Sequence, residues 1–378
     1  MPTEARDRLL VWRTSWLPRS NTFVRDQVRA YRGWDARSFG LIRERDPLVE
    51  PDRHVFGDGR VSHIALNRIP NPVQELMAAR RAKSLRPRLV HAHFGTDGLR
   101  AEGVAARLGV PLVVTFHGYD VTALRDKDEY AVALRGLVRR VDLLVAVSGF
   151  IEGRLHELGA DPARTLMHHT GIPVPPAPGE EGDRSGVLFV GRLVEKKGAA
   201  DLVAVYARLP VEVQAAHPLT IVGSGPLDDS LRALALRLGV EVEFTGSLDS
   251  SEVARRYARC AVACVPSKRA ANGDSEGLPT VILEAAAHGV PVIASVHAGN
   301  GEAVHDGETG LLFAEDDLDA LEAALEGLLP DAARRAAMGV RAREMVERDF
   351  DINRQTTHLE AAYDRLVGGV SPGRTRGS

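Results

Sequence analysis

Short, largely apolar runs alternate with longer helical stretches along this chain, and the alternation occurs twice. Short runs without a polar face are typical of parallel strands that are buried on both sides. Segments with helical character, such as residues 98–108 and 149–158, lie between them. The pattern predicts an α/β chain of two βαβ domains, each built on a parallel sheet. The apolar runs are 9–12, 89–93, 111–116 and 143–148, then 187–190, 219–222, 242–244, 261–265 and 291–294.

A segment rich in proline, glycine and acidic residues separates the two series. Residues 171–183 have the composition of a linker. Ligands of such folds bind at the carboxyl ends of the strands, so we expect a ligand in a cleft between two domains. The predicted division is an N-terminal domain over 1–173, a linker over 174–186, a C-terminal domain over 187–348, a helix over 349–368 that packs back on the N-terminal domain, and a disordered tail over 369–378.

Composition is that of a soluble globular protein. Hydrophobic residues make up 44% and charged residues 26% of the 378, and no run approaches the roughly 20 apolar residues that span a bilayer. The first residues lack the basic-then-apolar layout of a signal peptide, and both cysteines, Cys260 and Cys264, lie in an apolar run. These features predict a cytoplasmic protein with two buried, reduced thiols.

The net charge of −3 is unevenly distributed. Residues 1–180 hold 27 Lys and Arg against 21 Asp and Glu, whereas residues 181–378 hold 21 against 30. A basic N-terminal half is consistent with an anionic partner, and equally with ordinary scatter of surface charge. The basic segment 80–88 could lie on an anionic membrane leaflet, as in peripheral contact with the inner membrane face, or it could be a solvated helix end.

The loop after the run at 187–190 is the first candidate phosphate site. Arg192 and Lys197 lie in residues 191–198, at the end of a predicted strand, where α/β folds bind ligands. The chain has five lysines, and two of them are adjacent in this loop. A compact ammonium in a chain that otherwise uses arginine suits a diphosphate. The alternative is a solvated basic turn.

Residues 274–291 combine a predicted helix start with two carboxylates. Pro279 suits the first turn of a helix and Gly289 suits its end. The N–H groups and the dipole at such a helix start favour a phosphate. Glu276 and Glu284 bracket the start, and a phosphate site alone explains neither carboxylate.

A histidine also stands at a strand end. His117 follows the run at 111–116, and Gly118 permits a sharp turn after it. In this place the imidazole would face the predicted cleft. A lone histidine is as often structural, so the residues by themselves leave both interpretations open.

Three short motifs that could indicate a cofactor are incomplete. Gly223 begins a dinucleotide fingerprint whose third glycine is missing, so a tight turn is expected there rather than an NAD site. His91 and His93 share one face of a strand, but no further metal ligand has a suitable spacing. Asp126 and Asp128 lie in a charged segment typical of a solvated surface. We predict neither a metal nor a bound cofactor.

Together these stretches resemble the retaining nucleotide-sugar glycosyltransferases of family 4, which have the GT-B fold of two Rossmann-like domains facing each other across a cleft. The resemblance covers most of the chain. Its most specific part is the pair Glu276 and Glu284, in order with the loop of Lys197 and the loop of His117. The stretches that carry it are 91–95, 115–118, 191–198, 222–226, 276–284, 291–294 and 306–312.

The resemblance implies how the phosphates of the donor would be bound. Arg192 and Lys197 would neutralise the nucleotide diphosphate and take the place of a metal ion. Backbone N–H groups near Gly277 and Leu278 would hold phosphate oxygens at the helix start.

The resemblance also implies which residues contact the sugars. Glu284 would accept hydrogen bonds from the ribose hydroxyls, and Glu276 would hold hydroxyls of the transferred sugar. His117 would contact the donor sugar and the reacting centre. Gly223 and Pro279 complete the implied donor site.

The acceptor side is less defined, because the loop at residues 17–23 is polar where many relatives carry paired glycines. Such a loop resembles a subset associated with exopolysaccharide and antibiotic-sugar assembly. The segment 267–275 is longer than in the tersest relatives, and Lys268 or Asn272 could help to select the donor. The acceptor-side candidates are Asn21, Thr22, His93, Tyr119 and Asp120.

The resemblance predicts a metal-independent, retaining transfer of a hexosyl or N-acetylhexosaminyl group from a nucleotide sugar, in first place a UDP-sugar. The hydroxyl acceptor would belong to polysaccharide, glycolipid or antibiotic-sugar assembly. No nucleic-acid partner is expected, and the residues do not indicate an oligomeric state. The alternatives are a GT-B nucleotide-sugar 2-epimerase, which needs no acceptor, and a non-catalytic subunit that binds a sugar nucleotide.

Overall fold

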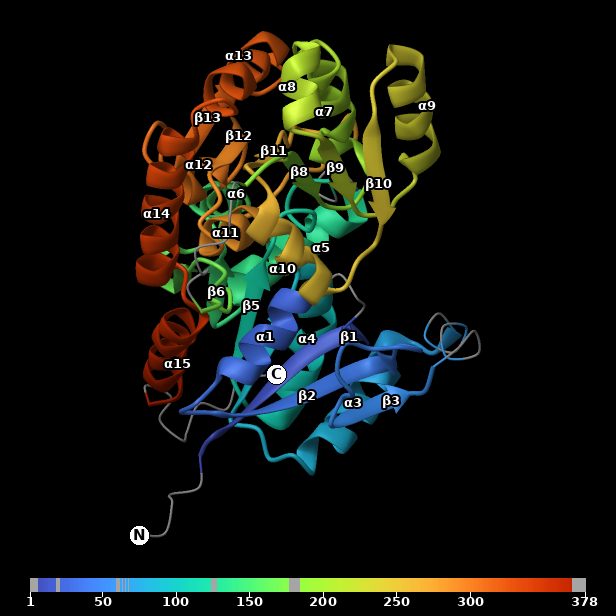
Figure 1. The fold of residues 1–378 in the computed structure, drawn as a ribbon. Coiled ribbons are helices and arrows are strands. Elements are labelled where there is room, and N and C mark those ends of the chain that lie inside the picture. The colour runs from blue at the N-terminus through green and yellow to red at the C-terminus, as the bar shows by residue number, and fades with distance from the viewer. Residues whose placement is uncertain are drawn as a thin grey trace. The chain divides into compact units, whose positions relative to one another are not determined.

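The chain divides into two compact units, Met1–Pro173 with Ile352–Ser378, and Val174–Asp351. The computed structural model describes residues 6–17, 21–58, 62, 64, 66, 68–123, 128–176 and 184–368. Figure 1 shows that each unit is built on a sheet with helices around it. Asp126, residues 177–183 of the predicted linker and the predicted tail at 369–378 lie outside the described residues.

A parallel sheet forms the centre of the first unit. Its strand order is β3-β2-β1-β4-β5-β6-β7, so the direction of winding changes between β1 and β4. Loops that follow strands on the two sides of such a switch leave room for a ligand at the carboxyl ends. The strands are β1 (Arg8–Trp16), β2 (Asp35–Arg43), β3 (Arg53–Phe56), β4 (Leu89–His93), β5 (Leu112–Phe116), β6 (Leu143–Ala146) and β7 (Thr165–Met167).

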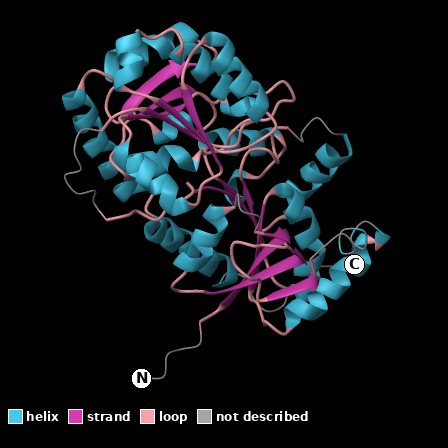
Figure 2. Cartoon of the chain, turned by 45° about the vertical axis from the view of Figure 1, so that its right-hand side comes forward, coloured by secondary structure: helices cyan, strands magenta, loops and turns pink. Residues whose placement is uncertain are grey.

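Helices cover both faces of this sheet (Figure 2). On one face Val11 packs in a cluster with Val24 of α1 and Leu359 of α15. On the opposite face Gly98 of α4 comes so close to the side chain of Val114 that an added Cβ would lie 2.9 Å from it. The helices are α1 (Thr22–Ala30), α3 (Asn71–Lys83), α4 (Gly95–Leu108), α5 (Asp128–Arg140), α6 (Gly149–Glu157), η1 (Pro162–Arg164) and α15 (Ile352–Gly368).

A single carboxylate fastens α15, far along the chain, to the turn before β2. Oε1 of Glu360 accepts hydrogen bonds from the backbone N–H groups of Arg32, Gly33 and Trp34 at 2.9, 2.8 and 3.0 Å. Glu360 is 8% exposed. Charge-assisted hydrogen bonds of this kind are stronger than neutral ones, so the three together fix the helix against the turn.

A buried chain of hydrogen bonds continues this contact into the sheet. The hydroxyl of Tyr363 lies 2.9 Å from that of Tyr31 and 2.7 Å from Nδ1 of His91. Nε2 of His91 lies 2.7 Å from Oγ1 of Thr115. Burial lowers the pKa of His91 to about 3. Both ring nitrogens of His91 are therefore engaged inside the unit, which assigns this histidine to packing.

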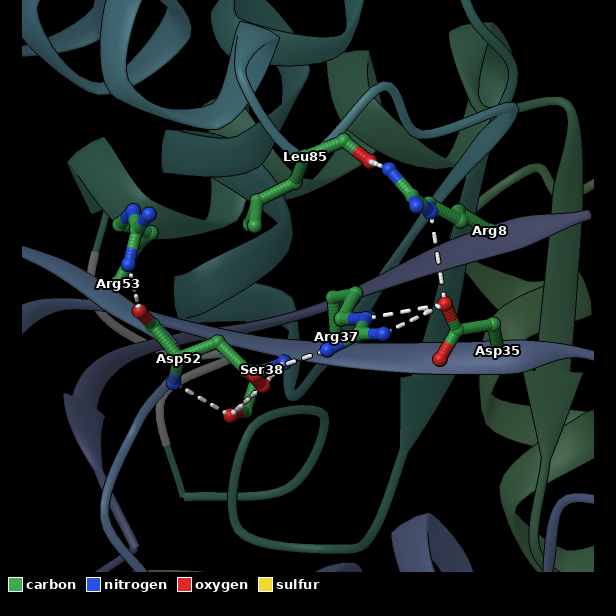
Figure 3. Close-up of polar contacts among 7 residues, drawn as sticks. All are labelled: Arg8, Asp35, Arg37, Ser38, Asp52, Arg53 and Leu85. Atoms are coloured by element: carbon green, nitrogen blue, oxygen red, sulfur yellow. Dashed lines mark hydrogen bonds and ion pairs between the residues drawn. The ribbon is translucent and has the colours of Figure 1, made fainter.

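Polar contacts also join β2 to the segment before β3 (Figure 3). Oδ2 of Asp52 accepts hydrogen bonds from the backbone N–H and the hydroxyl of Ser38, at 2.8 and 2.6 Å, and the N–H of Asp52 donates to Oγ of Ser38 at 2.8 Å. Arg37 forms ion pairs with Asp35 and Asp52. The reciprocal contact satisfies groups at the edge of the sheet that the short strand β3 does not pair.

The second unit has its own parallel sheet, with the strand order β10-β9-β8-β11-β12-β13. Its winding changes direction between β8 and β11. The strands are β8 (Val187–Val190), β9 (Leu219–Val222), β10 (Val242–Gly246), β11 (Val262–Val265), β12 (Val292–Val296) and β13 (Gly310–Ala314).

Helices flank this sheet as well, and one core cluster joins Phe189 and Ile221 of the sheet to Leu202 of α7 and Leu325 of α13. Within the described residues, none of the helices of either unit has the length and apolar character needed to cross a bilayer. The helices are η2 (Glu195–Lys197), α7 (Ala199–Tyr206), α8 (Val211–Ala216), α9 (Asp228–Leu238), α10 (Ser250–Arg259), α11 (Thr280–Ala287), α12 (Asn300–Ala303), α13 (Leu318–Leu328) and α14 (Ala332–Asp349).

The α/β fold class agrees with the prediction, and each apolar run of the sequence contains or overlaps a strand. Four strands were not predicted. β2 begins with polar residues, β3 and β7 have four and three residues, and β13 follows a Gly-rich turn. Three of the four lie at a sheet edge, where less apolar surface is buried and the sequence pattern is weaker. Cys260 and Cys264 are buried and form no disulfide.

We predict that Glu360→Ala lowers the free energy of unfolding by roughly 2–4 kcal/mol, because it leaves the three N–H donors of the turn before β2 without this acceptor. Glu360→Gln should cost less, since its amide oxygen still accepts hydrogen bonds. The exposed neighbour Thr357→Ala is the matched control. Urea unfolding followed by circular dichroism measures the effect, and equal midpoints for Glu360→Ala and Thr357→Ala would contradict the assigned role.

Candidate functional site

In the second unit, the loops after β8 and β11 meet at the switch in strand order. β8 pairs with β9 on one side and with β11 on the other. Residues 191–198 follow β8, and residues 266–279 lie between β11 and α11. The two loops are joined by the N–H of Lys268, which donates to the carbonyl oxygen of Lys196 at 2.8 Å. This is the place in an α/β sheet where ligands bind.

Two glycines let the loops of this unit touch backbone to backbone. Gly198 has a φ of +69°, and a Cβ added to it would lie 1.8 Å from the carbonyl oxygen of Pro266. Gly223 has a φ of +142°, and its added Cβ would lie 1.8 Å from the carbonyl oxygen of Gly191. No side chain fits at either position. Close packing of the loops after β8 and β9 therefore accounts for the incomplete dinucleotide fingerprint.

Two lysines and two carboxylates meet where these loops join. Nζ of Lys197 lies 3.2 Å from Oε2 of Glu276, and Nζ of Lys196 lies 3.5 Å from Oε1 of the same carboxylate. Nζ of Lys196 also lies 2.9 Å from Oδ1 of Asp274. The four side chains are only 10 to 17% exposed. Lys197 and Glu276 were each predicted from a different sequence motif. The structure brings them together and adds Lys196 and Asp274.

The charges of this cluster control the ionisation of its central carboxylate. Burial by itself would raise the pKa of Glu276, but the ammonium groups of Lys197 and Lys196 outweigh burial and lower it. Glu276 is therefore ionised at neutral pH. Its contribution to folding is present above the ordinary pKa of a glutamate and is lost as the pH falls through the lowered pKa.

Arg192 differs from the two lysines. Its side chain is exposed, and the guanidinium forms no hydrogen bond or ion pair with any residue that the structure describes. A guanidinium in this position can bind an incoming anion without first breaking an ion pair.

Helix α11 begins at the same place. Its first residue is Thr280, and Pro279 precedes it with a φ of −69°. Pro279, at the N-cap position, provides no side-chain hydrogen bond to this end, so the N–H groups of the first turn can bind an anion. Gly277 and Leu278 come just before the helix, and Glu284 is in its second turn, half-buried.

Two residues beside this cluster were not predicted from the sequence. His297 follows β12 and Glu315 follows β13, and Nδ1 of His297 lies 2.6 Å from Oε2 of Glu315. The backbone N–H of Glu276 donates to Nε2 of His297 at 3.3 Å. Their place directly after a strand was the available signal, but only the folded sheet shows that both lie against the loop of Glu276.

The first unit brings together two of its predicted histidines at the ends of β4 and β5. Nδ1 of His93 lies 3.2 Å from Nε2 of His117, and the rings of Phe23 and Phe94 lie 4.7 and 4.6 Å from that of His117. Burial lowers the pKa of both histidines well below the ordinary value, and the cation of Arg13 acts in the same direction. Both imidazoles are therefore neutral at pH 7.

Asp120 shapes the loop that carries His117. Its carboxylate accepts hydrogen bonds from the N–H groups of Gly95, His117 and Gly118 at 2.8, 3.2 and 3.0 Å. Asp120 is 1% exposed, whereas Tyr119 is 46% exposed. Burial raises the pKa of Asp120, and the three donors oppose that rise. The geometry gives Asp120 a role in holding this loop, while Tyr119 is the side chain at its surface.

The remaining acceptor-side candidates follow β1. Oδ1 of Asn21 accepts a hydrogen bond from Nη1 of Arg13 at 2.8 Å, and Nε of Arg13 lies 2.7 Å from Oδ2 of the buried Asp97. Thr22 begins α1. Residues 18–20 of the polar loop lie outside the described residues. Across the described part of the chain, no three or more His, Cys, Asp or Glu side chains gather as a metal site would require.

Two known families match adjacent parts of the chain, which together extend over residues 21–345. Residues 175–345 match the family described as glycosyl transferases group 1, and residues 21–174 match glycosyltransferase family 4.

Individual relatives agree with these matches. The chain is 34% identical over 285 residues to WcaL of Salmonella typhimurium, a glycosyltransferase named for colanic acid biosynthesis, covering 71% of this chain and 69% of WcaL. It is 41% identical over 165 residues to a GDP-mannose-dependent phosphatidylinositol monomannoside mannosyltransferase of Mycolicibacterium smegmatis, covering 43% of each. The fold is similar to that of HepE from Anabaena, solved in complex with UDP, with a TM-score of 0.75 and 17% identity over 95% of this chain and 99% of HepE. These likenesses show the GT-B fold.

We predict that Gly198→Ala lowers the melting temperature of the second unit, because its Cβ would lie 1.8 Å from a backbone oxygen at a positive φ. The loss should be at least about 2 kcal/mol. Gly327→Ala on α13 meets nothing within 4 Å and is the matched control. Calorimetry on both variants measures the effect, and an unchanged melting temperature for Gly198→Ala would show that the loops are not held this closely.

Proposed function

The chain belongs to the family 4 type of glycosyltransferases, and we propose that it transfers a sugar from a nucleotide-sugar donor, in first place a UDP-sugar, to a hydroxyl acceptor in polysaccharide or glycolipid assembly. The observation that carries the proposal is the cluster of Lys196, Lys197, Asp274 and Glu276 beside the uncapped start of α11. A diphosphate and a sugar ring carry the anions and the hydroxyls that these groups would bind.

Binding of the donor would exchange partners within the cluster. Lys197 now pairs with Glu276 at 3.2 Å. A diphosphate is the stronger partner for an ammonium group, since it offers more negative charge and several acceptor oxygens. Once Lys197 turns to the diphosphate, the carboxylate of Glu276 becomes available to accept hydrogen bonds from the hydroxyls of the sugar. The cluster thus offers an ammonium group to the phosphate and a carboxylate to the sugar, and the two groups pair with each other before the donor binds.

The same groups would lower the barrier to transfer. Departure of a nucleoside diphosphate builds negative charge on the leaving oxygens. Lys197, Arg192 and the N–H groups at the start of α11 would stabilise this charge without reorganising during the step. We propose on this basis that no metal ion is needed. Retention of the anomeric configuration is proposed from the resemblance to the retaining glycosyltransferases of family 4. The leaving phosphate would assist in removing the proton of the acceptor hydroxyl.

Two further residues complete the proposed donor contacts. Glu284 is in the second turn of α11, and side chains of a helix lean toward its N-terminus. Its carboxylate would therefore reach hydroxyls of the ribose. In the first unit we propose that His117 takes part in the transfer, because its neutral imidazole stands on a loop that Asp120 holds rigid.

The identity of the nucleotide is a separate part of the proposal. UDP is bound by the structural neighbour HepE, whereas the mycobacterial relative is named for GDP-mannose. We favour a UDP-sugar. Both nucleotides share the diphosphate and the ribose, which are the parts that Lys197 and Glu284 would contact.

We predict that Lys197→Ala lowers kcat/KM for the nucleotide sugar by about 10²- to 10³-fold, the loss typical of removing one preorganised stabilising group. Lys83→Ala, an exposed lysine of the first unit, is the control of equal charge change. Product formation from a radiolabelled donor measures both. Near-normal turnover by a folded Lys197→Ala variant would remove this lysine from the diphosphate site.

A panel of nucleotides and nucleotide sugars tests the donor. We expect UDP and one UDP-sugar to raise the melting temperature in a concentration-dependent way, because a ligand of the native state stabilises it by mass action. Transfer should persist when EDTA removes divalent ions. Stabilisation by GDP but not UDP would correct the base, and loss of transfer in EDTA that added Mg²⁺ or Mn²⁺ restores would overturn the metal-free mechanism.

A further inference from the structure

We propose that His297 and Glu315 are positioning residues that hold the backbone of Glu276 at the head of α11. This inference rests on the proposed function, because it concerns the glutamate assigned there to the transferred sugar. Neither residue would touch the donor. They would act through a hydrogen-bonded series that runs from Glu315 through the imidazole of His297 to the amide of Glu276.

The contacts form one continuous series from two strand ends to the loop before α11. Oε2 of Glu315, after β13, lies 2.6 Å from Nδ1 of His297, after β12. Nε2 of His297 accepts the backbone N–H of Glu276 at 3.3 Å. His297 is 6% exposed and Glu276 8%. A buried N–H without an acceptor is costly, so His297 decides whether the backbone of Glu276 can stay in this place.

The chemistry of the two ends fixes the tautomer of the imidazole. An ionised carboxylate only accepts hydrogen bonds, so Nδ1 of His297 must carry the proton that points to Glu315. A backbone N–H only donates, so Nε2 of His297 must present its lone pair to Glu276. The neutral Nδ1–H form satisfies both ends at once, and the Nε2–H form satisfies neither.

Other contacts anchor this series on the loop before α11. Oε1 of Glu315 accepts the backbone N–H of Arg269 at 2.6 Å, and the N–H of Gly299 donates to the carbonyl oxygen of Gly277 at 3.0 Å. Donation from Arg269 and His297 outweighs burial and lowers the pKa of Glu315. Glu315 thus contacts the loop before α11 at Arg269, while His297 contacts the same loop at Glu276.

The backbone enters the left-handed region directly after each positioning residue. Ala298, directly after His297, has a φ of +47°, and Asp316, directly after Glu315, has a φ of +65°. Residues other than glycine rarely adopt these values, and the cost of doing so is of order 1–3 kcal/mol each. Strain of this kind is found where the surrounding structure requires a side chain in one place. Here each such residue directly follows a side chain that contacts the loop of Glu276.

Two substitutions of His297 separate its two hydrogen bonds. In His297→Gln the amide oxygen can reach the place of Nε2 and accept from Glu276, while the contact to Glu315 is lost. In His297→Asn the amide nitrogen can take the place of Nδ1 and donate to Glu315, while Glu276 loses its acceptor. Both variants replace the same imidazole by a side-chain amide, so the general loss of stability should be similar.

We expect His297→Asn to lower kcat/KM for the nucleotide sugar by about 10- to 100-fold, while the Kd for the nucleoside diphosphate alone changes by less than about threefold. His297→Gln should retain most of the activity. Steady-state kinetics and calorimetric titration with UDP on the purified chain provide these values. Equal losses in the two variants, or a parallel loss of UDP affinity, would reduce His297 to a merely structural role and overturn the proposal.

The tautomer gives a readout that does not need turnover. The ¹⁵N shifts of histidine-labelled protein, with the His297 signals assigned by their absence in His297→Asn, should show a protonated Nδ1 and an unprotonated Nε2. Glu315→Gln should change these shifts. A protonated Nε2 in the native chain would overturn the proposal whatever the activity. A native chain with the expected tautomer that transfers sugar from no nucleotide donor would instead overturn the proposed function.

Discussion

The pairing of Lys196 and Lys197 with Asp274 and Glu276 is the interaction on which the candidate site depends. Four charges in side chains so little exposed would be unfavourable singly, and they are tolerated because each has an opposite partner. The pairing also sets the ionisation of Glu276. It requires the loops after β8 and β11 to lie in contact, and that contact exists because Gly198 has no side chain to keep Pro266 away.

The same rule, that buried polar groups must be satisfied, organises the first unit. His91 is engaged at both ring nitrogens, and Asp120 accepts three backbone N–H groups. Glu360 accepts three more from the turn before β2. Acidic side chains here act as fixed acceptors for loops and turns. A loop held in this way is already ordered. It can therefore present His117 and Tyr119 without the cost in conformational entropy that ordering a mobile loop would require.

Membership of the family 4 type of glycosyltransferases and the details of the site rest on different observations. The family follows from matches that together extend over residues 21–345 and from relatives with about one third identical residues. The structural neighbours have low sequence identity to this chain, so they are evidence for the fold and for nothing else. The donor, the stereochemistry and the acceptor are proposals. Among the residues proposed for the donor side, Lys197, Glu276 and Glu284 were singled out by the sequence, whereas Asp274, His297 and Glu315 were found only in the fold.

The sequence by itself determined the α/β class, the two series of strands and the order of the motifs, because apolar periodicity and the positions of glycine and proline are local properties. It could not predict β2, which begins with polar residues, or β3, a strand of four residues at a sheet edge. Only the tertiary structure decided which residues meet. His297 and Glu315 are separated from Glu276 by about twenty and forty residues. His297 contacts Glu276, and Glu315 contacts Arg269 of the same loop, because parallel strands bring their carboxyl ends to one edge of the sheet.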